Sequence, residues 1–86
     1  MAKWFVYFLK CRDGSLYTGI TNDLDKRFNE HMSGRGSKYV RSRKAKKIVY
    51  IENFPTKSGA LKREAELKHL SRQRKLELIK YWQLKK

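Results

Sequence analysis

The turn at residues 13–15 constrains this fold more than any other feature. Asp13-Gly14-Ser15 lies between two runs rich in aromatic and β-branched residues, 4–9 and 16–21. A turn of this composition between two such runs predicts a β-hairpin. Because the first run is apolar at consecutive positions, we expect its strand to be covered on both faces of a sheet.

The length of the hairpin loop decides which side chains share a face. A two-residue turn would place Tyr7 and Tyr17 on opposite faces, because side chains alternate along a strand. A three-residue loop of residues 13–15 would pair position 7 with 21 and position 11 with 17, which places both tyrosines and Gly19 on one face. We therefore predict a loop of odd length, or a bulge, in this hairpin.

The helix that follows is predicted from its cap and its apolar spacing. Asn22 is a suitable N-cap, and Leu24, Phe28 and Met32 recur every four residues to form an apolar face. Gly34 is expected to end this helix.

The remaining pattern predicts one more strand and two more helices. Residues 48–54 alternate as a strand does, and helices are expected over 58–70 and 72–83. The order β-β-α-β-α-α predicts an α+β fold, a small three-stranded antiparallel sheet flanked by helices. Residues 1–84 would form a single domain, with 85–86 as a loose C-terminal end.

Charge narrows the class of partner. The 86 residues hold 22 Lys and Arg against 8 Asp and Glu, a formal net charge of +14. Self-repulsion makes such an excess costly for a compact state, so a polyanionic partner is the expected reason for it. Nucleic acid is favoured over a ribosomal location, an acidic lipid surface or mere solubility, since no amphipathic surface helix with a long apolar face is evident.

Composition also indicates a compartment. No apolar run approaches the roughly 20 residues that cross a bilayer. The N-terminus shows no apolar leader, and the single cysteine, Cys11, allows no internal disulfide. We expect a cytoplasmic protein with no membrane association.

Basic residues concentrate between positions 35 and 47, where no acidic residue occurs. Glycines and serines make this segment loop-like, and a tyrosine adds an aromatic face on which a base or sugar could stack. Contact with a phosphate backbone is favoured over a merely solvated loop. The candidate nucleic-acid-binding residues are Arg35, Lys38, Tyr39, Arg41, Arg43, Lys44, Lys46 and Lys47.

Three polar residues occupy helix positions beside apolar ones. Arg27 and His31 share a helix face at the border of the expected core. The neighbouring Arg favours a neutral imidazole that can accept a proton near pH 7, although an ordinary exposed pair is the alternative. Glu64 takes an apolar slot, where a carboxylate is costly unless it is paired or bound to a cation. It could form an ion pair with Lys68 or Lys57, or bind a Mg²⁺ that keeps several waters.

Together these segments resemble the GIY-YIG nuclease domain. The matching pieces are Phe5-Val6-Tyr7, Tyr17-Thr18-Gly19, Arg27-x-x-x-His31 and Arg63-Glu64, in order and over essentially the whole chain. The run 11–21 resembles the small single-domain bacterial branch, which is related to the nuclease domain of an excision-repair endonuclease subunit. Phe5 and Val6 replace the glycine and isoleucine of the first motif, and Met32 stands where the branch often has an asparagine.

The resemblance implies an activity and a set of partners. It implies divalent-metal-dependent hydrolysis of phosphodiester bonds in DNA, by a structure-limited endonuclease linked to repair or recombination. A non-catalytic nucleic-acid-binding module on the same scaffold is the alternative. RNA is a less favoured substrate than DNA. Specificity would come from the basic segment, a homodimer or a protein partner.

The resemblance also implies a role for each motif residue. Tyr7 and Tyr17 would be the motif tyrosines, one of which helps to deprotonate the attacking water. Gly19 would be the motif glycine, where a Cβ would crowd the site. Arg27 would neutralise charge on the phosphoryl group, His31 would relay a proton, and Glu64 would hold a single Mg²⁺ or Mn²⁺.

Overall fold

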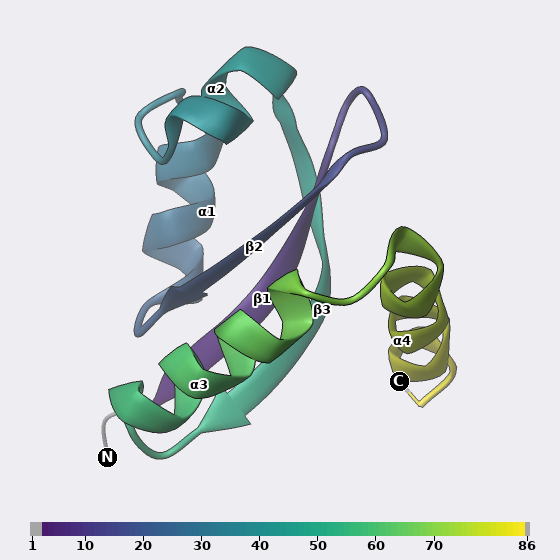
Figure 1. Cartoon of the computed structure of the whole chain (residues 1–86). Coiled ribbons are helices and arrows are strands. Elements are labelled where there is room, and N and C mark those ends of the chain that lie inside the picture. The colour runs from purple at the N-terminus through teal and green to yellow at the C-terminus, as the bar shows by residue number, and fades with distance from the viewer. Residues whose placement is uncertain (1–2, 86) are drawn as a thin grey trace.

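A three-stranded antiparallel sheet in the order β2-β1-β3 forms the centre of the molecule (Figure 1). The computed structural model describes residues 3–85. The strands are β1 (Trp4–Cys11), β2 (Leu16–Thr21) and β3 (Ala45–Phe54). The helices are α1 (Leu24–Met32), α2 (Lys38–Arg43), α3 (Lys57–Lys68) and α4 (Arg72–Leu84). The predicted α+β fold is confirmed, with one helix more than expected.

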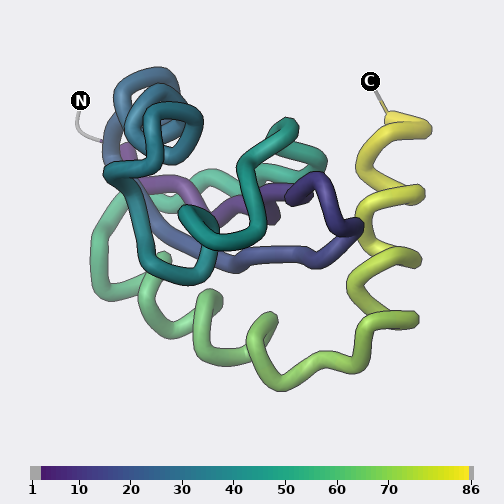
Figure 2. The backbone as a smooth tube through the Cα atoms, turned by 90° about the horizontal axis from the view of Figure 1, so that it is seen from above, coloured from purple at the N-terminus to yellow at the C-terminus, as the bar shows by residue number. Residues whose placement is uncertain are grey.

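The central strand β1 separates two apolar cores, as its continuous hydrophobicity predicted. Val6 and Phe8 pack with residues of α3 and α4, whereas Tyr7 and Leu9 pack with residues of α1 and α2. In Figure 2, α1 and α3 accordingly lie on opposite sides of the strands, with α4 beyond the end of α3. The sheet therefore has an α1 face and an α3 face. The alternation along β1 assigns each of its side chains to one of them.

The opening hairpin has a loop of odd length, as predicted. Tyr7 pairs with Gly19 and Leu9 with Tyr17, so both tyrosines and the glycine lie on the α1 face. The loop is one residue earlier than expected, residues 12–14, because the N–H of Cys11 donates to the carbonyl of Ser15 at 2.9 Å. The tip closes this way because residue 14, a glycine with φ +86°, occupies the left-handed last position of a three-residue loop. The register is thus shifted by two residues, which leaves the facing of the side chains unchanged.

Strand β3 departs from the alternation expected of it. Phe8 pairs with Tyr50 but Leu9 pairs with Ile48, so Val49 is an extra residue at a bulge. Val49 and Tyr50 both join the core on the α3 face as a result. The strand also begins at Ala45 rather than at 48.

The basic segment is not a loop throughout, which corrects the prediction for residues 35–47. Residues 38–43 form helix α2, capped by Ser37, whose hydroxyl accepts a hydrogen bond from the N–H of Val40 at 3.1 Å. Val40 is fully buried and anchors the helix to the α1 face. Lys44 ends it with φ +66°. The serine cap and one apolar anchor outweigh the glycines and charges nearby.

Helix α1 begins one residue later than predicted. Asp23, not Asn22, is the N-cap, because its carboxylate accepts from the N–H of Lys26 at 3.1 Å. Gly34 adopts φ +83° just after the helix, as its expected role requires. The predicted apolar face was wrong at Met32, which is 51% exposed, whereas the neighbouring His31 is buried.

The C-terminal helix continues to Leu84, and the N–H of Lys85 donates to the carbonyl of Trp82 at 3.2 Å. Residue 86 of the predicted loose end lies outside the described residues. Within residues 3–85, none of the helices combines the length and apolarity that crossing a membrane requires.

Candidate active site

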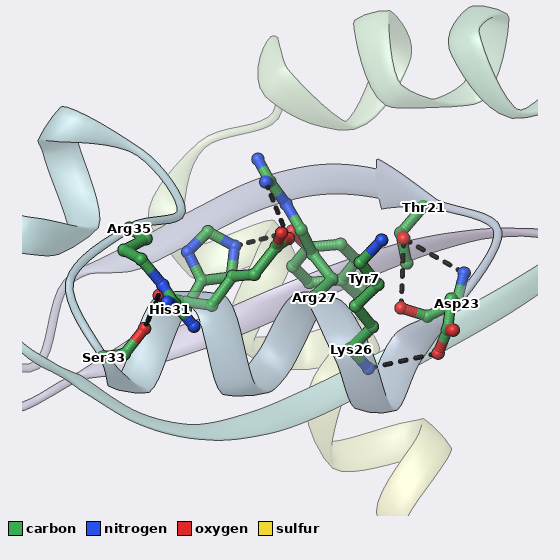
Figure 3. A network of polar contacts seen from close by, with 9 residues as sticks. Tyr7, Thr21, Asp23, Lys26, Arg27, His31, Ser33 and Arg35 are labelled. Atoms are coloured by element: carbon green, nitrogen blue, oxygen red, sulfur yellow. Dashed lines mark hydrogen bonds and ion pairs between the residues drawn. The ribbon is translucent and has the colours of Figure 1, made fainter.

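Tyr7 and His31 form a buried hydrogen-bonded pair on the α1 face (Figure 3). The Tyr7 hydroxyl lies 2.8 Å from Nε2 of His31. Tyr7 is 1% exposed and His31 3%. The pair joins the centre of β1 to the last turn of α1. Since Tyr17 lies on the neighbouring strand, its ring centroid is 6.2 Å from that of Tyr7 and 5.2 Å from that of His31.

Gly19 makes room for these rings. It lies opposite Tyr7 in the sheet, and a Cβ at this position would come within 2.5 Å of the Tyr7 hydroxyl oxygen and 2.8 Å of Cε2 of Tyr17. The expectation that a side chain here would crowd the site is supported by this geometry.

The surroundings of His31 favour its neutral form. Burial, and then the charge of Arg27, lower the pKa of His31 to about 4, although Glu30 acts in the opposite direction. Its Nδ1 has no hydrogen-bond partner among residues 3–85. A neutral imidazole with its proton on Nδ1 can accept a hydrogen bond from the Tyr7 hydroxyl at Nε2. We assign this tautomer to His31 because Tyr7 is its hydrogen-bond partner.

Arg27 stands beside both tyrosines and is held by a carboxylate. Burial raises the pKa of Tyr7 to about 12, and Arg27 opposes that rise through a hydrogen-bonding interaction. The guanidinium interacts with the Tyr17 hydroxyl as well. One of its nitrogens is 3.3 Å from Glu30 Oε1, in an ion pair whose side chains are 30% and 33% exposed. Arg27 is therefore a partly exposed cation beside the tyrosine pair.

Glu64 approaches the same place from α3. Its side chain is only 17% exposed, and Lys68 Nζ lies 3.5 Å from its Oε2. The ion pair with Lys68 that the sequence offered is therefore present. Glu64 is also among the charges that raise the pKa of Tyr7, which places its carboxylate within electrostatic reach of the hydroxyl. Four of the five polar motif residues thus lie together, from β1, β2 and α1, and Glu64 on α3 lies within electrostatic reach of Tyr7.

The candidate nucleic-acid-binding residues lie around α2 and the start of β3, all exposed to solvent. Three of them have structural partners, Arg35, Tyr39 and Arg43. Arg43 donates to Asp13 at 2.9 Å and stacks 4.4 Å over the ring centroid of Tyr39, which fastens α2 to the hairpin loop. Arg35 donates to the Ser33 hydroxyl at 3.1 Å. The others are Lys38, Arg41, Lys44, Lys46 and Lys47.

A hollow beside the site is lined by basic side chains that form no ion pair among residues 3–85. It measures about 440 Å³ and lies between the end of α1, α2 and the hairpin loop. Arg12, Arg41 and Lys44 line it, and His31 forms part of its wall. No acidic residue among residues 3–85 lines it. No ion pair involves these three cations in the described part of the chain. The hollow suits an anion.

Sequence reasoning missed three residues of this region. Glu30, three positions after Arg27 on the same helix, was detectable as an ion-pair spacing. Arg12 was not, because only the hairpin loop geometry brings it to the hollow. Gly36 packs on the His31 ring, a contact with no local sequence pattern.

The residues present fit a metal ion that takes few protein ligands. Among residues 3–85, no group of three or more His, Cys, Asp or Glu side chains is placed to bind a metal ion. Mg²⁺ is commonly held by one or two carboxylates and completes its shell with water and substrate phosphate. The half-buried Glu64 carboxylate fits that requirement.

The order of these elements and motif residues matches a known protein family. Residues 3–77 match the GIY-YIG catalytic domain. The chain belongs to this family, and so to a nuclease superfamily whose substrates are nucleic acids.

Within that family the chain is similar to the UPF0213 proteins, which are small bacterial proteins. It is 53% identical to the UPF0213 protein of Staphylococcus saprophyticus over 79 residues, which cover 92% of this chain and 96% of the relative. The solution NMR structure of the UPF0213 protein from Bacillus halodurans shares 46% identity with a TM-score of 0.59, covering 92% of this chain and 84% of that one. An E. faecalis protein solved by NMR shares 38% identity with a TM-score of 0.64, covering 98% and 90% of the two chains.

Proposed function

We propose that this protein is a divalent-metal-dependent endonuclease that hydrolyses phosphodiester bonds in DNA. The observation that carries the proposal is the convergence of Tyr7, Tyr17, Arg27 and His31, with Glu64 within electrostatic reach. Phosphoryl transfer depends mainly on positioning and on stabilising charge on the phosphoryl oxygens. A guanidinium beside two phenol groups, with a carboxylate able to hold a metal ion, meets those needs.

The two tyrosines would have different roles, because their exposure differs. Tyr17 is half-buried, whereas Tyr7 is closed off from solvent. In this scheme the Tyr17 oxygen takes a proton from the attacking water as its own hydroxyl proton passes to solvent, and the water's oxygen bonds to phosphorus. The ester P–O bond then breaks, and the leaving oxygen takes a proton from solvent. Arg27, which interacts with the Tyr17 hydroxyl, stabilises the negative charge that develops on the phosphoryl group.

His31 would orient Tyr7. Because its pKa is lowered to about 4, His31 is largely unprotonated near neutral pH. In this scheme it therefore acts as a hydrogen-bond acceptor for Tyr7, in place of the proton relay that the resemblance implies. Tyr7, fixed by that bond, presents its oxygen to Arg27. Glu64 would hold Mg²⁺ or Mn²⁺, which when bound supplies Lewis-acid polarisation of a phosphoryl oxygen.

The basic residues around α2 would hold the DNA backbone. Arg41 and Lys44, unpaired beside the site, are best placed to do so. One site cuts one strand, so a double-strand break would require a homodimer or a second protein. We extend the proposal to a structure-limited role in repair or recombination.

A non-catalytic nucleic-acid-binding module is the second candidate, and one observation favours it. Arg27 is paired with Glu30, and Glu64 is paired with Lys68. A metal ion at Glu64 would have to displace Lys68, and a phosphate at Arg27 would have to compete with Glu30 for the guanidinium. A module that only binds would have no need to displace them.

A cleavage screen separates the two functions. The purified protein is incubated with end-labelled single-stranded, duplex and branched DNA, and with RNA, in Mg²⁺, Mn²⁺ or EDTA. We expect cuts in at least one DNA substrate with metal and none with EDTA. Binding without cleavage across the whole panel would favour the second candidate.

A further inference from the structure

Gly36, in the segment between α1 and α2, lies against the His31 imidazole. A Cβ on Gly36 would come within 2.7 Å of Cε1 and 2.9 Å of Cγ of the ring, and closer still to Nδ1. Such separations are well inside van der Waals contact, so any side chain here requires the ring or the main chain to move. Of the described glycines, Gly14 and Gly34 have a positive φ, and Gly36 does not. Glycine is therefore needed at 36 for space and not for backbone conformation.

The ring has little freedom to make that space. Its Nε2 is bonded to the Tyr7 hydroxyl at 2.8 Å, and only 3% of the residue is exposed. The Tyr17 ring packs edge-on against it, with centroids 5.2 Å apart. A side chain at 36 must therefore break the bond between His31 and Tyr7 or lift segment 33–37 off the imidazole.

Gly19 leaves space beside Tyr7, the other member of the pair, in the same way. It excludes side-chain atoms from the neighbourhood of the Tyr7 hydroxyl, as Gly36 does from that of His31. The two glycines come from different parts of the chain, β2 and the connection between α1 and α2. Main chain thus lies directly against each member of the hydrogen-bonded pair.

We propose that Gly36 is a positioning residue of the cleavage site, which lets the segment between α1 and α2 close over His31 and hold its imidazole on Tyr7. The part of this inference that concerns cleavage rests on the proposed function. The part that concerns His31 does not, and it can be measured without a substrate.

The titration of His31 tests the inference directly. The groups that act on or face its imidazole are Tyr7, Tyr17, Arg27 and Glu30, together with three cations that line the same hollow, Arg12, Arg41 and Lys44. We expect Gly36→Ala to raise the pKa of His31 from about 4 toward the ordinary value near 6.5, because both ways of relieving the clash expose the ring to water or free it from Tyr7. The measurement is an NMR pH titration of the imidazole in a His69→Gln background, which leaves a single histidine.

Gly59→Ala is the matched control. Gly59 lies in α3, where a Cβ would be 3.4 Å from Cδ1 of Phe54 and from Oγ1 of Thr56, an approach far milder than that at Gly36. The pKa of His31 should be unchanged in this variant. A His31 pKa that also stays near 4 in Gly36→Ala would overturn the inference.

A double variant decides the question if Gly36→Ala does not fold. His31→Ala removes the ring that the new methyl group would strike, so His31→Ala/Gly36→Ala should be as stable as His31→Ala alone. A double variant as unstable as Gly36→Ala would show that the glycine serves something other than His31.

Cleavage then tests the functional part. At saturating DNA we expect Gly36→Ala to lower kcat by about 10²-fold with little change in KM, because a displacement near 1 Å at a reacting group costs on this order. The same substitution should have no further effect in the His31→Ala background. If the unmodified protein cleaves nothing, the proposed function fails while the titration still decides the role of Gly36. An unchanged kcat alongside a shifted His31 pKa would refute the positioning role.

Discussion

The two faces of the sheet differ in how fully their polar side chains are hydrogen-bonded. On the α3 face, the Arg63 guanidinium donates two hydrogen bonds, of 2.9 and 3.1 Å, to the Glu52 carboxylate. The Tyr50 hydroxyl donates to the same carboxylate. On the α1 face, Nδ1 of His31 has no hydrogen-bond partner among residues 3–85, and the carboxylate partner of Arg27 is Glu30, at a longer 3.3 Å.

The comparison distinguishes a structural network from a site. Arg63 has its guanidinium committed to Glu52 and Glu66, so it fastens α3 to β3 and has little capacity left for a ligand. Arg27 keeps capacity for a phosphate oxygen. A closed network stabilises a fold, whereas an open one beside bulk water is available for binding and chemistry.

Arg27→Ala should have the largest effect. We expect cleavage to fall by about 10²–10³-fold, because a donor that stabilises charge in the transition state is lost. The free energy of unfolding should change by no more than about 1 kcal/mol, since the pair with Glu30 is partly exposed. The measurement is single-turnover cleavage together with urea unfolding. Arg74→Ala, which removes an exposed arginine paired with Glu77 on α4, is the control and should keep full activity.

Acid should destabilise the α1 face through His31. The folded-state pKa of about 4 lies below the ordinary 6.5, so the unfolded chain takes up a proton first as pH falls. This stabilisation is complete above about pH 6.5 and is lost as pH falls toward 4, a change of about 3 kcal/mol. Urea unfolding between pH 7 and 4 measures it. His31→Gln should flatten the dependence, and an equally steep dependence in that variant would assign it to other groups.

Arg63→Ala should affect stability more than chemistry. Removing the guanidinium leaves the half-buried Glu52 without its main partner, so the free energy of unfolding should fall by about 1–2 kcal/mol. Cleavage by the folded fraction should stay within about tenfold of the unmodified protein, well short of the loss from Arg27→Ala. A loss of activity as large as that of Arg27→Ala would remove the distinction between the two faces.

Arg41→Ala should have the smallest effect. If its side chain contacts one phosphate, binding weakens on every DNA sequence and the slope of log affinity against log salt decreases by about 1. Fluorescence anisotropy over a range of salt concentrations measures this. Lys80→Ala on α4 removes an exposed charge far from the hollow along the chain. An equal change in that control would mean that only net charge matters.

The sequence predicted those features that depend on local patterns. The odd hairpin loop followed from the requirement that Tyr7 and Tyr17 share a face, and it is present. The exact register was wrong by two residues, because Gly14 at positive φ, rather than Ser15, closes the loop. A shift by an even number of residues leaves each side chain on the same face of the sheet. Tyr7 and Tyr17 therefore still share a face, as predicted.

Features set by distant parts of the chain were not predictable. Helix α2 depends on Val40 reaching a core that β1 creates, and the bulge at Val49 depends on pairing with β1. The packing of Gly36 on His31 arises only once α1 and α2 are placed together. These contacts have no sequence spacing of their own, whereas the half-buried Glu64 was visible as a charge in an apolar stripe.

Cleavage by Glu64→Gln, measured beside its binding, tests the central claim that the polar groups near Tyr7 form a metal-dependent nuclease site. The unmodified protein and the variant are compared on one fluorescent DNA with Mg²⁺ and Mn²⁺. We predict that both bind with affinities within about twofold, and that the variant loses on the order of 10²-fold or more in cleavage rate. Equal metal-dependent cleavage by the two proteins, or binding by both with no cleavage by the unmodified protein, would contradict the claim.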